Sequence, residues 1–149
     1  MLSHDEQEVR RTWFRRHWEE VAFNRLCGIT VRRWDRESVE LHLPFDERLT
    51  AHDGVLHGGV LATLIDTAGC GAVAAGHDFN HGSRITTLSM SLQYLDVARG
   101  EDITATAVCT KRGRQTQFAE VVLRSESGKR IAQGMVTILV SGERAGVPG

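Results

Sequence analysis

The stretch Val55-Leu56-His57-Gly58-Gly59-Val60-Leu61-Ala62-Thr63-Leu64-Ile65-Asp66-Thr67-Ala68 decides the fold of this chain. It continues as small and apolar residues to Ala75, so a helix over the segment has scarcely a polar face. Such a helix must be buried nearly all round, and other parts of the chain have to wrap it. We therefore expect one long central helix, which the chain reaches through a polar loop at residues 46–54.

The material that wraps this helix is expected to be β-sheet. Apolar and polar residues alternate in strand-like segments at residues 85–95, 102–110, 115–125 and 129–140, separated by short turns. Two earlier segments, at residues 29–34 and 38–43, predict a hairpin that Pro44 ends. Because consecutive strands usually pair, we expect the last four strands to form an antiparallel meander. The expected fold class is α+β, with an antiparallel sheet curled around a long central helix.

Both ends of the chain lie outside this core, which we place at about residues 27–140. From residue 5 to about residue 23, apolar side chains recur at three- and four-residue intervals, which predicts an extra N-terminal helix. Residues 141–149 have no periodic pattern, and we expect a frayed tail there. A length of 149 residues fits one domain, 1–149.

The composition narrows the function classes. Lysine and arginine number 18 against 19 acidic residues, so the net charge of −1 gives no general attraction to nucleic acid or anionic lipid. No basic stretch followed by an apolar run occurs at the N-terminus, so neither secretion nor membrane spanning is indicated. The three cysteines are widely spaced and argue against a disulfide framework and a zinc site. We expect a cytoplasmic protein that binds neither nucleic acid nor membrane.

Asp66 is the residue of the central segment that most favours chemistry. A carboxylate among apolar neighbours in a buried helix is costly unless it is hydrogen-bonded or useful, and a purely structural hydrogen bond is the alternative. Gly58 and Gly59 lie where the loop enters the helix, and glycine there lets a ligand approach free N–H groups backed by the helix dipole. This interpretation as an oxyanion site competes with one in which the glycines only allow close packing.

His57 precedes the two glycines and could act as a base. A histidine at a helix start more often caps the helix or orients a loop, so we rank it below Asp66. On a helix, Asp66 lies about 12 Å from Gly58 along the axis, so one chain cannot bring both to one carbonyl. If both act on the same group, they belong to different subunits of a symmetric dimer.

Other catalytic patterns do not occur in this sequence. It has no serine-nucleophile elbow, no His-Glu-x-x-His and no P-loop spacing, and its scattered histidines lack metal-ligand spacing. Because these patterns are absent from the sequence, we expect a hydrolase that uses neither a metal nor a cofactor.

The segment at residues 54–68 resembles the hotdog-fold thioesterases of the phenylacetate-degradation type, relatives of the 4-hydroxybenzoyl-CoA thioesterases. The resemblance continues in the stretches Thr87, Tyr94-Leu95, Gly100-Glu101-Asp102-Ile103, Arg112-Gly113-Arg114 and Gly128-Lys129-Arg130-Ile131-Ala132. It covers residues 27–140 and leaves the N-terminal helix largely outside. It implies hydrolysis of an acyl-CoA thioester to a carboxylic acid and CoA, in homodimers that often pair into homotetramers.

The resemblance also implies roles for single residues. The N–H group of Gly58 would polarise the thioester carbonyl, and Asp66 would serve as general base or nucleophile. Thr87 would supply a strand hydroxyl of the kind that lies near the attacking water in some members. Next to the oxyanion donor, His57 is a further catalytic candidate, and Gly59 is a candidate for substrate binding.

The remaining candidates concern substrate binding. CoA is a polyanion, and Arg112-Gly113-Arg114 follows a lysine and gathers basic side chains in a turn, which suits phosphates. Many hairpins, however, carry such basic turns only for solubility. Many family members have an amide side chain six residues before the histidine, where this chain has Ala51, and His52 is the candidate to replace it.

Two other functions stay open at this point. A hotdog enoyl-CoA hydratase or dehydratase would need a histidine–carboxylate pair placed for proton transfer next to the thioester. A non-catalytic acyl-CoA-binding protein would keep the fold and the pocket without turnover, and the departure at Ala51 is compatible with it.

Overall fold

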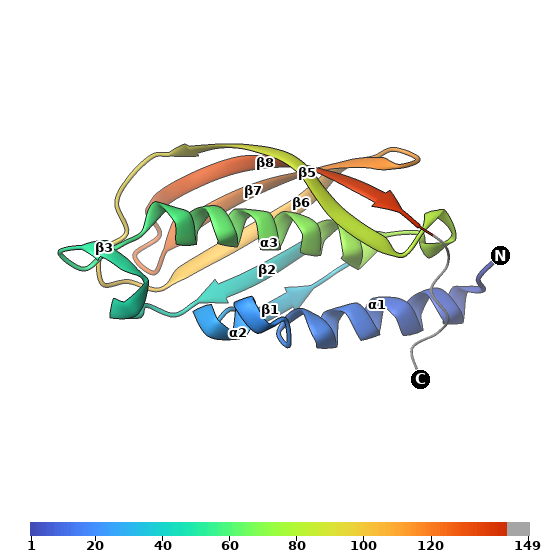
Figure 1. Cartoon of the computed structure of the whole chain (residues 1–149), viewed down its shortest axis with the longest axis horizontal. Helices are drawn as coiled ribbons and strands as arrows, with labels where there is room; N and C mark the ends of the chain where they lie inside the picture. The colour runs from blue at the N-terminus through green and yellow to red at the C-terminus, as the bar shows by residue number, and fades with distance from the viewer. Residues whose placement is uncertain (143–149) are drawn as a thin grey trace.

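The computed structural model describes residues 1–142, so most of the tail expected at residues 141–149 lies outside the described residues. At the centre is α3 (Gly58–Gly76), a helix of 19 residues. A six-stranded antiparallel sheet curls around this helix, as Figure 1 shows. The expected α+β class and the sheet wrapped around one long helix are confirmed.

The strands follow closely the strand-like segments of the sequence. They are β1 (Thr30–Trp34), β2 (Ser38–Leu43), β5 (Arg84–Tyr94), β6 (Ile103–Arg112), β7 (Thr116–Ser125) and β8 (Arg130–Ser141). Every pairing among them is antiparallel. Their order across the sheet is β1-β2-β6-β7-β8-β5.

The expected meander of the last four strands is wrong in one connection. β6, β7 and β8 follow one another, but β5 pairs with β8 rather than with β6. Alternation of side chains shows which face of a strand is buried and carries no information about its neighbours, so the crossover could not be read from the pattern. The consequence is that β5 is an edge strand, whose outer row of N–H and C=O groups is unpaired within residues 1–142.

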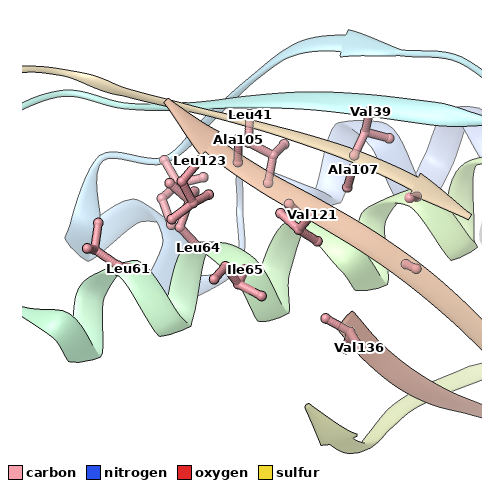
Figure 2. Packing of buried hydrophobic residues seen from close by; sticks show 14 of the residues in the cluster. Val39, Leu41, Leu61, Leu64, Ile65, Ala105, Ala107, Val121, Leu123 and Val136 are labelled. Carbon is pink, nitrogen blue, oxygen red and sulfur yellow. The ribbon is translucent and has the colours of Figure 1, made fainter. Parts of the chain in front are cut away.

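The core forms between α3 and the concave face of the sheet. Figure 2 shows Leu61, Leu64 and Ile65 of α3 pointing toward sheet side chains that include Leu41 and Leu123. Burial of one such side chain contributes about 1.5–3 kcal/mol. The length and apolarity of α3 would also suit a membrane span, but its packing inside this sheet identifies it as a core helix.

The N-terminal helix expected at residues 5–23 is in fact two helices, α1 (His4–Trp18) and α2 (Ala22–Cys27). The break between them is stabilised because the Asn24 side chain donates a hydrogen bond of 2.7 Å to the carbonyl oxygen of Trp18. That bond satisfies a carbonyl group at the end of α1, which a continuous helix would have satisfied through its backbone. α1 packs against α3 and β1, on the side of the molecule away from β5 (Figure 1).

Short elements occupy the two ends of α3. The polar loop before it contains a 3-10 turn, η1 (Glu47–Leu49), and a hairpin of β3 (Thr50–His52) and β4 (Val55–Leu56). A second 3-10 turn, η2 (Phe79–His81), leads from α3 to β5. The hairpin delivers the chain directly to the first turn of α3.

Candidate active site

Asp66 lies in the middle of α3, in contact with β5. The hydroxyl of Thr87 in β5 donates a hydrogen bond to Oδ1 of Asp66, with 2.6 Å between the two oxygens. Cys70, one turn further along α3, places its Sγ 3.8 Å from the same Oδ1 and 3.1 Å from the Thr87 hydroxyl oxygen. The three side chains form a small polar cluster between an otherwise apolar helix and the edge strand.

The two oxygens of the Asp66 carboxylate differ in their surroundings. Oδ1 is held by the Thr87 hydroxyl and approached by the Cys70 thiol, whereas Oδ2 has no hydrogen-bond partner in the described part of the chain. Burial raises the pKa of the Cys70 thiol to about 12, so the thiol stays protonated and can donate toward the carboxylate. A carboxylate held by one oxygen can use the other to accept a proton from water or to attack a carbonyl carbon.

Gly58 is the first residue of α3, and its N–H group has no hydrogen-bond partner among residues 1–142. The N–H of Gly59 donates to Nδ1 of His57 at 2.8 Å, so the His57 side chain caps the helix. From the other side, the Tyr94 hydroxyl donates to the carbonyl oxygen of Gly58 at 2.9 Å. A free N–H at the start of a long helix is favourably placed to stabilise a developing negative charge.

The Gly58 and Asp66 halves of the site do not meet within one chain. The two residues are separated along α3 by about 12 Å, as expected from the rise of a helix. Each half is nevertheless attached to β5, Asp66 through Thr87 and Gly58 through Tyr94. β5 therefore carries both attachments, and it does so at the open edge of the sheet.

The candidates of the preceding hairpin lie near the start of α3. Ala51 and His52 belong to β3, and both are exposed. The backbone of His52 pairs with Val55 of β4, whereas its exposed imidazole has no hydrogen-bond partner within the described residues. The ring is therefore available to a ligand on the Gly58 side of the site. Its role in binding stays a prediction.

Arg112, in the basic turn after β6, lies against the C-terminal end of α3. Arg112 donates to the carbonyl oxygens of Ala72 and Val73 at 3.1 and 3.0 Å, to that of Arg36 and to the Gln117 side chain, so both terminal nitrogens are fully engaged. Arg112 thus satisfies carbonyls at the C-terminal end of α3. Its expected role in phosphate binding stays a prediction.

Gly76 and Gly113 make the geometry of this turn possible. Gly76 permits the approach of Arg112, because a Cβ there would collide with the guanidinium group and with the carbonyl of Arg36. The N–H of Gly113 donates to the carbonyl of Thr116 and closes the turn, while Arg114 is exposed. Substrate binding by Gly113 and Arg114 stays a prediction.

Reasoning from the sequence missed two residues of the site, Cys70 and Tyr94. Cys70 follows Asp66 by four residues, a spacing that places two side chains on one face of a helix, so a signal was present. Tyr94 contacts Gly58 across 36 positions of sequence, and no local pattern reports such a contact.

Two further features of the described residues concern metal binding and the surface of the sheet. Within residues 1–142, no group of three or more His, Cys, Asp or Glu side chains could hold a metal ion. A hollow of about 400 Å³ lies on the outer face of the sheet, lined by residues that include Ser91, Gln93 and Met135. Neither Asp66 nor Gly58 lines it.

Comparison with known proteins identifies the family. Residues 53–132 match the family described as the thioesterase superfamily. The chain is 29% identical over 134 residues to the medium/long-chain acyl-CoA thioesterase YigI of Escherichia coli, covering 80% of this chain and 86% of the relative. It is 34% identical over 118 residues to acyl-coenzyme A thioesterase 13 of Pongo abelii, covering 77% of this chain and 82% of the relative.

A solved structure agrees in fold. The Escherichia coli PaaI protein from the phenylacetic acid degradation operon superposes with a TM-score of 0.79 at 21% identity, covering 91% of this chain and 97% of that one. The matched family region, residues 53–132, spans both halves of the site. The chain therefore belongs to the thioesterase superfamily of hotdog-fold proteins and is a thioester hydrolase.

Proposed function

We propose that this enzyme hydrolyses acyl-CoA thioesters to a free carboxylic acid and CoA, and that it needs no cofactor besides the CoA of its substrate. The observation that carries the proposal is the pair of half-sites on α3. One is the Asp66 carboxylate with a free oxygen, and the other is the free N–H group of Gly58. The names of the Escherichia coli and Pongo abelii relatives support the substrate class.

In the proposed reaction, the N–H of Gly58 donates to the thioester carbonyl oxygen and stabilises the charge that develops there. Oδ2 of Asp66 takes a proton from a water molecule as the water oxygen bonds to the carbonyl carbon, while Thr87 holds Oδ1. The C–S bond then breaks, and the CoA thiolate takes up the proton. If Asp66 attacks the carbonyl carbon itself, the C–S bond breaks, CoA leaves as the thiolate and a mixed anhydride forms. Water then hydrolyses the anhydride to the carboxylic acid and the free Asp66 carboxylate, and the thiolate takes up the proton that is released.

A complete site requires a second copy of the chain. Large apolar side chains are exposed on or just after the edge strand β5, among them Leu88, Leu95 and Val97, which are 48–56% exposed. Exposed apolar side chains beside an unpaired strand edge are typical of a sheet that continues into a partner. We therefore infer a homodimer in which the two β5 strands pair antiparallel about a twofold axis.

We infer the register of this pairing from the two residues of β5 that hold the half-sites, Thr87 and Tyr94. Leu88 is left out of the β5–β8 ladder between Thr87 and Ser89. A twofold axis through Ser91 then places Thr87 opposite the partner's Tyr94, since each lies three ladder positions from the axis. Because Thr87 holds Asp66 and Tyr94 holds Gly58, this register joins the Asp66 half of one chain to the Gly58 half of the other. Pairing of such dimers into tetramers stays a prediction.

The proposal is tested with a panel of acyl-CoA substrates, starting from medium and long acyl chains because the Escherichia coli relative is named for them. Loss of the thioester and release of free CoA are measured together. Asp66→Asn keeps the size of the side chain and removes the base, so kcat/KM should fall by about 100- to 10,000-fold. Loss of crotonyl-CoA absorbance without free thiol would indicate a hydratase instead. Tight binding without turnover would indicate a binding protein.

A matched pair of variants at Gly58 tests the oxyanion donor. Proline is well tolerated at the first helical position, where it removes the N–H group and adds a ring. His57 already has the extended backbone (φ −61°, ψ 135°) that proline prefers before it. Alanine keeps the N–H and adds a Cβ that would lie 3.3 Å from the Tyr94 ring, a contact that proline also makes. Gly58→Pro should lower kcat by about 100- to 1,000-fold, whereas Gly58→Ala should keep most activity. Equal activity of the two variants would contradict the role of the N–H.

A further inference from the structure

We propose that Tyr94 is a positioning residue for the oxyanion donor: its hydroxyl holds the start of α3 so that the Gly58 N–H points at the thioester carbonyl. The inference rests on the proposed function, because it assigns a task within the same site. The hydrogen bond from the Tyr94 hydroxyl to the Gly58 carbonyl, 2.9 Å long, carries it.

The free N–H of Gly58 lies between two anchored backbone groups. On its N-terminal side, the N–H of His57 donates to the carbonyl oxygen of Leu49 at 2.9 Å. On its C-terminal side, the peptide group between Gly58 and Gly59 is held at both ends, its carbonyl by Tyr94 and its N–H by the His57 imidazole. The Gly58 N–H, which is the unpartnered donor of this turn, therefore lies between backbone groups that are held by hydrogen bonds.

The start of α3 needs such an anchor because two glycines stand there in succession. Glycine has no Cβ to restrict its backbone, and the first N–H groups of a helix lack intrahelical partners. A displacement of about 1 Å between reacting groups can cost about 100-fold in rate, so a mobile donor would be a poor catalyst. The Tyr94 ring lies against Gly58 as well, at 3.3 Å from the position that a Cβ would take.

Tyr94 is itself held firmly. It pairs with Ala132 in the ladder between β5 and β8, and the two residues after it both donate their N–H groups to the carbonyl oxygen of Ile131. Tyr94 therefore holds the start of α3 in a fixed position relative to the sheet. In the proposed dimer it also lies opposite the partner's Thr87, at the junction of the two halves of the site.

The Tyr94→Phe variant tests this role, since it removes the hydroxyl and keeps the ring. Because the side chain is half-exposed within one chain, at 54%, the variant should fold normally. Because the ring is kept, it should also dimerise normally, and thermal melting and gel filtration check both points. We expect kcat to fall by about tenfold with KM nearly unchanged, because donor alignment matters most in the transition state. Thr110→Val is the matched control: it deletes another hydroxyl-to-carbonyl bond, to Phe118, far from α3 in sequence, and should leave kcat unchanged.

A double-variant cycle separates positioning from a merely structural role. If Tyr94 acts through the Gly58 N–H, then Tyr94→Phe should have no further effect in the Gly58→Pro background, where that N–H is absent. The same fold-loss in both backgrounds would overturn the inference, as would wild-type kcat in Tyr94→Phe or an effect confined to KM. The proposed function fails by a different observation, namely no release of CoA by the wild-type enzyme or full activity of Gly58→Pro, and either result also removes the role of Tyr94.

Discussion

Two inactive variants, mixed in one dimer, should restore activity if the site is shared between subunits. In a heterodimer of Asp66→Asn and Gly58→Pro chains, one site joins the intact Asp66 of one chain to the intact Gly58 of the other. The second site carries both defects. Random association of equal amounts makes half of the dimers heterodimers, so the mixture should reach about a quarter of wild-type activity, and isolated heterodimers about half.

The size of the gain makes the assay decisive. Each parent variant should retain at most about 1% of wild-type activity, so the mixture should exceed the mean of its parents by about 25-fold. The two chains are produced together with different affinity tags, heterodimers are isolated through both tags, and loss of the acyl-CoA thioester is followed. Light scattering on the same samples verifies that they are dimers.

A reversed pairing is the matched control. A chain with both substitutions, combined with a wild-type chain, gives a heterodimer in which each shared site has one defect. That heterodimer should be nearly inactive, whereas sites contained within single chains would leave it with half of wild-type activity. No gain in the first heterodimer, together with half activity in the second, would refute the site shared between subunits.

Three further changes probe the helix and its surroundings. If Asp66 acts as proposed, Cys70→Ala should lower kcat by about three- to tenfold because Oδ1 of Asp66 loses a donor, while Cys70→Ser should restore kcat on the same substrates. Equal activity of all three proteins would show that the thiol contributes only to packing. Arg112→Met should lower the free energy of unfolding in urea by about 3 kcal/mol, since the carbonyls of Ala72 and Val73 lose a charged partner. The KM of this variant should stay unchanged. Unchanged stability with a raised KM would instead favour phosphate binding by Arg112. Burial lowers the pKa of His77 from 6.5 to about 4, so the unfolded chain binds a proton more readily than the folded chain. The free energy of unfolding should therefore fall by up to about 3 kcal/mol as the pH drops from about 6.5 to about 4. Thermal melting at pH 7 and pH 5 measures this loss, and a His77→Phe variant that kept the full pH dependence would assign it to other groups.

Much of the fold could be predicted because its signals are local. The apolar run that became α3 is buried as its composition required, and the alternating segments became strands with nearly the expected bounds. The hairpin of β3 and β4 was missed because strands of three and two residues are too short for a period to show. The break after Trp18 was missed because it depends on one side-chain hydrogen bond from Asn24.

In the candidate site, too, only the residues with a local signal in the sequence could be predicted. Asp66 could be singled out from the sequence because a carboxylate in an apolar helix contradicts its surroundings, and Gly58 because glycine at a helix start leaves donors accessible. The task of Arg112 could not be read, because charge in a turn does not reveal which groups it meets. Its partners are carbonyls about 40 residues away along the chain.

By itself, the sequence determined a buried central helix, an antiparallel sheet around it, and a carboxylate and a helix start on that helix too far apart to serve one carbonyl. Only the tertiary structure decided that β5 leaves its neighbours in sequence and forms the edge of the sheet, where Thr87 holds Asp66 and Tyr94 holds Gly58. The physical reason is that periodicity and burial are properties of single segments, each set by its own residues. Strand order and contacts between distant residues depend on backbone pairing and packing across the whole chain, and no single segment contains that information.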